Sequence, residues 1–135
     1  MKQQQREPGI QESQPEKFIL VVEDDAANGE VIELVITAET PYRVRCASTA
    51  EAALQLISER KPDLLLLDDL LPGMHGLELY DYLHTIPALS TIPALLISAN
   101  NHRSEEVERH HLTFLPKPYE IATLLETIHA LLERE

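Results

Sequence analysis

The sequence predicts an α/β fold in which a five-stranded parallel sheet is covered by helices on both faces. Short apolar runs at 17–22, 63–67 and 94–98 suit strands that are buried on both sides. Segments with apolar residues at helical spacing separate the strands, so that strand and helix alternate five times along the chain. This alternation is typical of a parallel sheet with crossover helices.

The first strand, at 17–22, is followed by Asp24 and Asp25, either of which could cap the first helix. We expect Pro41 to end that helix. Apolar residues at helical spacing predict its inner face, which would carry Val31, Leu34, Val35 and Ala38.

Arginines alternate with apolar residues at 42–47, which predicts a half-exposed edge strand. Ser48 or Thr49 would cap the next helix, and Lys61-Pro62 would end it. Its expected inner face carries Ala50, Ala53, Leu54 and Ile57.

A central strand at 63–67 precedes a third helix, and the strand at 94–98 precedes a short helix that starts at Ser104. A brief strand at 112–115 and an amphipathic helix complete the pattern. The inner faces of the third and last helices are expected to carry Leu77, Tyr80 and Leu83, and Ile121, Leu124, Leu125, Ile128 and Leu131, respectively.

The 135 residues correspond to one domain at 17–135, preceded by a polar tail at 1–16 that we expect to be flexible. With 11 basic and 23 acidic residues, the net charge of −12 argues against nucleic acid or an anionic membrane as the main partner and is compatible with cation binding. One cysteine, Cys46, excludes an internal disulfide and favours a reducing cytoplasm.

Polar residues directly follow the predicted strands. In parallel sheets, ligands bind beyond the carboxyl ends of the strands. Taken alone, each of these residues could be a helix cap, a loop hydroxyl or a solvated charge. As a set they are expected to converge, and they are Glu23, Asp24, Asp68, Ser98 and Lys117.

Three converging carboxylates repel one another, by roughly 3 kcal/mol per pair at about 5 Å and an effective dielectric constant near 20. A hard divalent cation such as Mg²⁺ would offset that repulsion and is typically shared with a phosphate. With Lys117 as a second cation and Ser98 as a hydroxyl donor, the set suits a phosphoryl group on an aspartate nucleophile.

Four segments, FILVVEDD, KPDLLLLDDLLPGMHGLE, IPALLISAN and FLPKPYE, together resemble the receiver domains of bacterial two-component response regulators over roughly residues 17–134. The resemblance implies the doubly wound, flavodoxin-like receiver fold with strand order 2-1-3-4-5. It also implies a signalling protein rather than an enzyme, although receivers catalyse their own phosphorylation and autodephosphorylation.

The resemblance assigns the phosphoacceptor to Asp68, because Pro72 and Gly76 stand four and eight residues after it, as in the family. Counting from Asp69 breaks both spacings. The other implied roles are Mg²⁺ (or Mn²⁺) ligands at Glu23, Asp24, Asp68 and the backbone carbonyl of Leu70, a phosphate contact at Lys117, switch residues at Ser98 and Phe114, and a cis bond between Lys117 and Pro118.

The resemblance further implies a sensor histidine kinase or a histidine phosphotransfer protein as phosphoryl donor, in the cytoplasm. Only three residues follow Leu132, so we expect a single-domain regulator of the chemotaxis or phosphorelay type that contacts a downstream target protein and does not bind DNA or a membrane directly. The oligomeric state stays open between a monomer and a phosphorylation-dependent dimer.

The sequence departs from the family at three places. The segment between Ser98 and Lys117 is a few residues short, which predicts a truncated or shifted fourth helix. Asp69 stands where the family has an apolar or variable residue; we expect a solvated loop charge, or alternatively an extra acid near the metal. His75 is expected to be a turn residue.

Two alternatives belong to other functional classes. A degenerate receiver would serve as an interaction module that is never phosphorylated, and the altered fourth helix favours it. A Mg²⁺-dependent aspartyl phosphatase would need an aspartate two residues after its nucleophile, where this chain has Leu70.

Overall fold

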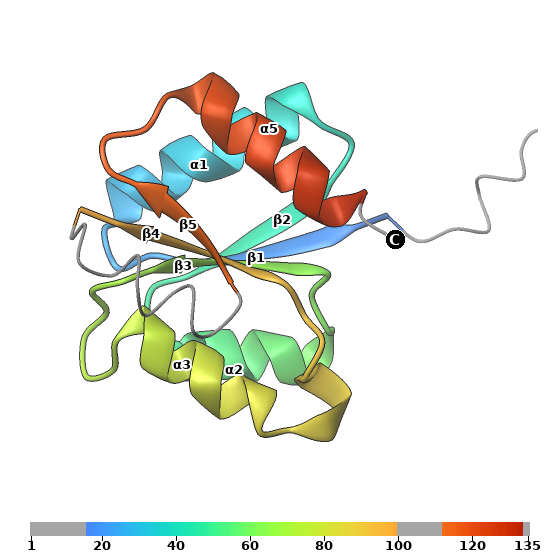
Figure 1. The fold of residues 1–135 in the computed structure, drawn as a ribbon, viewed down its shortest axis with the longest axis vertical. Helices are drawn as coiled ribbons and strands as arrows, with labels where there is room; N and C mark the ends of the chain where they lie inside the picture. The colour runs from blue at the N-terminus through green and yellow to red at the C-terminus, as the bar shows by residue number, and fades with distance from the viewer. Residues whose placement is uncertain (1–15, 100–111, 134–135) are drawn as a thin grey trace, which may run out of the picture.

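The computed structural model describes residues 16–99 and 112–133. Its centre is a parallel sheet of five strands in the order β2-β1-β3-β4-β5, as predicted (Figure 1). The elements, in chain order, are β1 (Phe18–Val22), α1 (Ala26–Glu39), β2 (Arg43–Ala47), α2 (Ala50–Glu59), β3 (Leu64–Asp68), α3 (Gly76–His84), the 3₁₀ turn η2 (Pro87–Leu89), β4 (Ala94–Ser98), β5 (Thr113–Pro116) and α5 (Ile121–Leu132).

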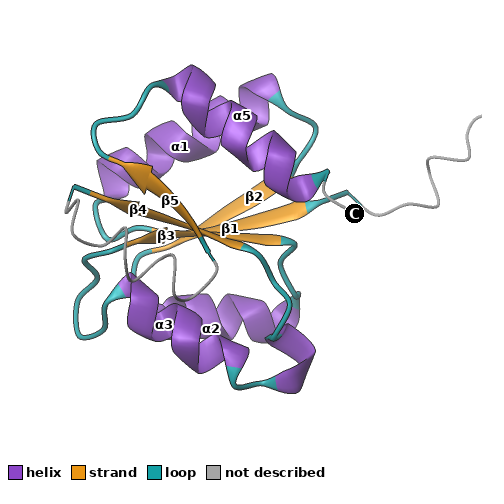
Figure 2. Ribbon diagram, viewed as in Figure 1, coloured by secondary structure: helices purple, strands orange, loops and turns teal. Residues whose placement is uncertain are grey.

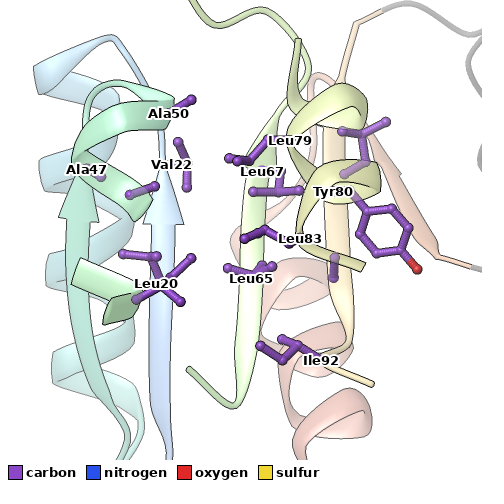
Figure 3. Close-up of a cluster of buried hydrophobic side chains, with 14 of the residues drawn as sticks. Leu20, Val22, Ala47, Ala50, Leu65, Leu67, Leu79, Tyr80, Leu83 and Ile92 are labelled. Carbon is purple, nitrogen blue, oxygen red and sulfur yellow. The ribbon is translucent and has the colours of Figure 1, made fainter. Parts of the chain in front are cut away.

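The helices form two layers, with α1 and α5 on one face of the sheet and α2 and α3 on the other (Figures 1 and 2). Each layer covers its own apolar core. Figure 3 shows the core under α2 and α3, where Leu65 and Leu67 of β3 lie beside Leu79 and Leu83 of α3, and Leu20 of β1 belongs to the same core. No described helix is long and apolar enough to cross a membrane.

Strand β3 lies at the centre of the sheet between β1 and β4, and all five of its residues are buried. Its side chains alternate between the two cores: Leu65 and Leu67 face α2 and α3, whereas Leu64 and Leu66 face α1 and α5. This alternation decides where the polar residues at the end of β3 point.

The predicted inner face of α1 was wrong. Val31 and Leu34 are 52% and 69% exposed, and the buried stripe is instead Gly29, Ile32 and Ile36. Because apolar residues occupy almost every position from 31 to 36, the helix offers more than one stripe at helical spacing. Packing against β1 and β2, rather than the pattern itself, selects the stripe that is buried.

Most local predictions agree with the structure. The cap of α1 is Asp25, whose carboxylate accepts the N–H of Asn28, and the cap of α2 is Thr49, whose hydroxyl oxygen accepts the N–H of Ala52. Strand β2 is a half-exposed edge strand. In α5, Leu124, Ile128 and Leu131 are buried as expected, but Ile121 is 40% exposed because it opens the helix at the edge of the core.

Two predictions lie outside the described residues. The polar tail at 1–16 falls there apart from Glu16, and so do the helix start at Ser104 and most of the shortened fourth-helix segment.

The two candidate faces of α1 can be compared directly by truncation. We expect Ile36→Ala to lower the free energy of unfolding by about 3 kcal/mol, because it leaves a cavity among fully buried neighbours. Leu34→Ala, the matched control on the same helix, is expected to cost less than about 0.5 kcal/mol. Urea unfolding of both variants measures this, and similar losses would contradict the observed face.

Candidate functional site

The carboxyl ends of the strands bring the predicted polar residues together. Glu23 directly follows β1, Asp68 ends β3, Ser98 ends β4 and Lys117 directly follows β5. Carboxylate oxygens of Glu23, Asp24 and Asp68 lie within 4.8 Å of one another. Glu23 and Asp68 are buried, whereas Asp24 is exposed, so the cluster has one solvent-facing side.

Burial raises the pKa of the Glu23 carboxyl from 4.5 to about 7, and the neighbouring Asp68 carboxylate adds to the rise. Two contacts act in the opposite direction: the N–H of Asp25, which donates to Glu23 Oε2 at 3.1 Å, and the positive charge of Lys117. Burial is thus the main reason why the Glu23 carboxyl holds its proton, and the charge of Asp68 adds to it.

Asp68 is held by donors on one side. Its Oδ1 lies 3.4 Å from Lys117 Nζ, in an ion pair that links β3 to β5, and 3.4 Å from the backbone N of Leu70. Both contacts are long for hydrogen bonds. The carboxylate is therefore oriented by the lysine and the following turn without being tightly clamped by either.

The loop after β3 closes tightly on itself at Gly76. The N–H of Gly76 donates to the backbone oxygen of Asp69 at 3.0 Å. A Cβ added at Gly76 would stand 2.3 Å from the backbone oxygen of Asp68, so no other residue fits without a backbone shift. Gly73, in the turn after Pro72, has a φ of 77°, which favours glycine.

The expectation that Asp69 is a solvated loop charge was wrong. Asp69 is 2% exposed, and its Oδ2 accepts a hydrogen bond from the Ser98 hydroxyl at 2.9 Å. Its N–H donates to the backbone oxygen of Ile97, which extends the β3–β4 ladder by one residue. Side-chain alternation along β3 therefore directs Asp69 toward the side of Leu65 and Leu67, a signal that was present in the sequence.

The remaining predicted site residues are located as follows. Phe114 on β5 is partly buried against the core under α2 and α3. The Lys117–Pro118 peptide bond is cis.

Leu70 exposes 66% of its surface, and its backbone lies beside Asp68. His75 caps α3, where its N–H donates to Glu78 at 2.8 Å, so it is a turn residue as expected.

The donor set fits a hard divalent cation. Carboxylate oxygens are the ligands that Mg²⁺ and Mn²⁺ take, and three of them lie close enough here to share one ion. A cation there would also favour the charged form of the buried Glu23 carboxyl, which burial disfavours.

Residues 19–129 match the response regulator receiver domain family. The chain belongs to this family. It is 34% identical over 116 residues to the response regulator PleD of Caulobacter vibrioides. The aligned segment covers 84% of this chain and 25% of PleD. The chain spans about half of the length of other curated relatives, and two of these relatives are each covered over 51% of their length.

Solved structures agree with the family assignment. A putative response regulator from Chloroflexus aurantiacus superimposes with a TM-score of 0.82 at 31% identity, covering 89% of this chain and all of that one. The chemotaxis protein CheY4 of Vibrio cholerae gives 0.78 at 21% identity, covering 87% and 99%, and supports the fold alone.

The contact at Gly76 predicts that even the smallest side chain is harmful there. We expect Gly76→Ala to lower the free energy of unfolding by about 2 kcal/mol, because its Cβ would displace the backbone of Asp68. Gly73→Asn is the control: that position has open space, and asparagine tolerates a positive φ, so the loss should stay below about 1 kcal/mol. Urea unfolding measures both, and an undisturbed Gly76→Ala protein would contradict the contact.

The pKa of Glu23 predicts a dependence of stability on pH when cations are removed with EDTA. A carboxyl with a higher pKa in the folded chain holds its proton better there, so stability falls as the pH rises from about 4.5 through 7. At 1.36 kcal/mol per pKa unit, this shift sets an upper limit of about 3 kcal/mol, and solvent screening on the open side of the cluster lowers the effect below it. We expect Glu23→Gln to be more stable than the wild type in EDTA at pH 8.

Thermal or urea unfolding at pH 5 and pH 8 tests this expectation. Added Mg²⁺ should stabilise the wild type more than Glu23→Gln, because the variant lacks one of the three clustered carboxylates. Glu30→Gln, on the exposed side of α1, removes one negative charge elsewhere and should leave the pH dependence unchanged. A Glu23→Gln protein with the same pH profile as the wild type would contradict the role of Glu23.

Proposed function

We propose that this chain accepts a phosphoryl group from a phosphohistidine donor onto Asp68, in a reaction that requires Mg²⁺ or Mn²⁺. One observation carries the proposal: the oxygens of Glu23, Asp24 and Asp68 lie within 4.8 Å of one another, and the Lys117 ammonium lies 3.4 Å from Asp68. Membership of the receiver family supports the same reaction.

In this proposal a carboxylate oxygen of Asp68 attacks the phosphorus atom in line with the phosphohistidine nitrogen. The new P–O bond forms as the P–N bond breaks, and the imidazole leaves with the electron pair of that bond and takes a proton. Such transfers depend mainly on positioning and charge stabilisation rather than on covalent help from the protein. Lys117 and the turn at Leu70 position the nucleophile before the donor arrives.

Glu23, Asp24, Asp68 and the backbone carbonyl of Leu70 would hold the cation, which when bound neutralises charge on the phosphoryl oxygens. Lys117 contributes a positive charge from the β5 side. Its distance of 3.4 Å from Asp68 leaves it able to turn toward an added phosphoryl oxygen. Ser98 and Phe114, on β4 and β5, would respond to the phosphoryl group as the switch pair.

The partners belong to the same proposal. The donor would be a sensor histidine kinase or a histidine phosphotransfer protein, and the phosphorylated chain would act by contacting a downstream target protein. We place the chain in the cytoplasm on the basis of its single cysteine, Cys46.

Intact mass spectrometry after incubation with acetyl phosphate tests the acceptor. We expect one phosphoryl adduct, about 80 Da heavier, that requires Mg²⁺ and is lost in Asp68→Asn, because the amide is not a nucleophile for this reaction. Asp69→Asn is the matched control, since it makes the same chemical change one residue later and should still form the adduct.

Each outcome has a distinct meaning. Loss of the adduct only in Asp69→Asn would move the acceptor to Asp69. The absence of an adduct in every form, with acetyl phosphate and with a phosphorylated histidine phosphotransfer domain as donor, would favour an interaction module that is never phosphorylated.

A further inference from the structure

The hydroxyl of Ser98 and the carboxylate of Asp69 form a buried pair behind the proposed acceptor. Ser98 Oγ donates to Asp69 Oδ2 at 2.9 Å, and the two residues are 3% and 2% exposed. Hydrogen bonds to a charged acceptor are stronger than those between neutral groups, and exclusion of water strengthens them further. The Ser98 hydroxyl is therefore firmly held where it lies.

The backbone fixes this pair on both sides. The N–H of Asp69 donates to the Ile97 oxygen at 3.0 Å, and the Ser98 oxygen accepts from the N–H of Lys117 at 2.9 Å. Strand β4 pairs with β3 and β5, so neither residue can leave without breaking sheet hydrogen bonds. Only a side-chain rotation can separate the hydroxyl from the carboxylate.

Asp68 and Asp69 belong to opposite faces of the sheet. Leu64 and Leu66 precede Asp68 in the alternation of β3 and face α1 and α5, whereas Leu65 and Leu67 precede Asp69 and face α2 and α3. Ser98 follows Ala94 and Leu96 on the Asp69 side. In the structure, its hydroxyl therefore meets Asp69 and not Asp68.

We propose that Asp69 is a positioning residue that holds the Ser98 hydroxyl away from Asp68 and so opposes phosphoryl binding at the acceptor. This inference rests on the proposed function. A serine hydroxyl has one hydrogen to donate, so it cannot serve Asp69 and a phosphoryl oxygen fully at the same time. Binding that recruits Ser98 must first break its hydrogen bond to Asp69, which lowers the apparent affinity.

The affinity for beryllofluoride, a phosphoryl analogue formed from BeCl₂ and excess NaF in MgCl₂, measures this competition. We expect Asp69→Leu to lower the Kd about tenfold, which corresponds to about 1.4 kcal/mol. Leucine has the same branched outline of four side-chain heavy atoms as aspartate, but it accepts no hydrogen bond. Asp69→Asn, which keeps an acceptor oxygen without the charge, should lower the Kd less.

Ser98→Ala provides the decisive background, because it removes the hydroxyl that Asp69 holds. We expect Asp69→Leu to change the Kd by less than twofold when Ser98 is already alanine, so that the two substitutions couple by about fivefold or more. Isothermal titration calorimetry on the four proteins measures the coupling. Thermal unfolding checks that each is folded; should Asp69→Leu not fold, Asp69→Asn takes its place in the same cycle.

A gain of the same size in both backgrounds would mean that Asp69 acts only by its negative charge, and an unchanged Kd in the Asp69 variants would mean that it does not act at all. Either result overturns the inference. Failure of the proposed function is distinguishable, because then the wild type itself would not bind beryllofluoride in the presence of Mg²⁺.

Discussion

The alternation of side chains along β3 is the constraint on which the site depends. It directs Asp68 to the face of α1 and α5, where Glu23 lies, and directs Asp69 to the face of α2 and α3, where Ser98 lies. Two adjacent and chemically identical side chains thereby enter different environments. A shift of β3 by one residue would exchange them, and the apolar residues that precede them would exchange faces as well.

The loop after β3 fixes this register independently of the strand. Gly76 packs against the backbone of Asp68, and its N–H returns to the backbone of Asp69, so the turn closes over both aspartates. The contact explains physically why a glycine stands eight residues after Asp68: a Cβ there would occupy the space of the Asp68 carbonyl. Sheet pairing and loop closure thus fix the same positions for Asp68 and Asp69.

The sequence was sufficient for the fold because the information there is local and repeated. Every predicted strand that lies in the described residues is present, and the sheet order follows the family resemblance. The inner face of α1 could not be read, because apolar residues fill nearly all positions from 31 to 36 and only packing on the sheet selects Ile32 and Ile36. Helical periodicity identifies a face only where the opposite face is polar.

The candidate site shows a different limit to what can be predicted from the sequence. The convergence of Glu23, Asp24, Asp68 and Lys117 follows from the rule that polar residues after parallel strands share one edge, and the structure agrees. The sequence predicts a loop charge at Asp69, whereas in the structure the ladder of hydrogen bonds continues through it. A charged side chain is usually expected to be exposed to solvent. Asp69, however, stands two and four residues after Leu67 and Leu65, so its side chain points into the protein as theirs do.

Asp68 and Asp69 differ in their electrostatic surroundings, and they therefore have different roles. Asp68 lies beside Glu23 and Asp24, whose carboxylate oxygens are within 4.8 Å of one another, so a cation at this edge of the sheet would be attracted by all three. Asp69 lies in a buried pair with Ser98, where its carboxylate accepts the hydrogen bond of the hydroxyl. The first aspartate thus favours binding at the sheet edge, and the second sets how readily Ser98 can respond to it.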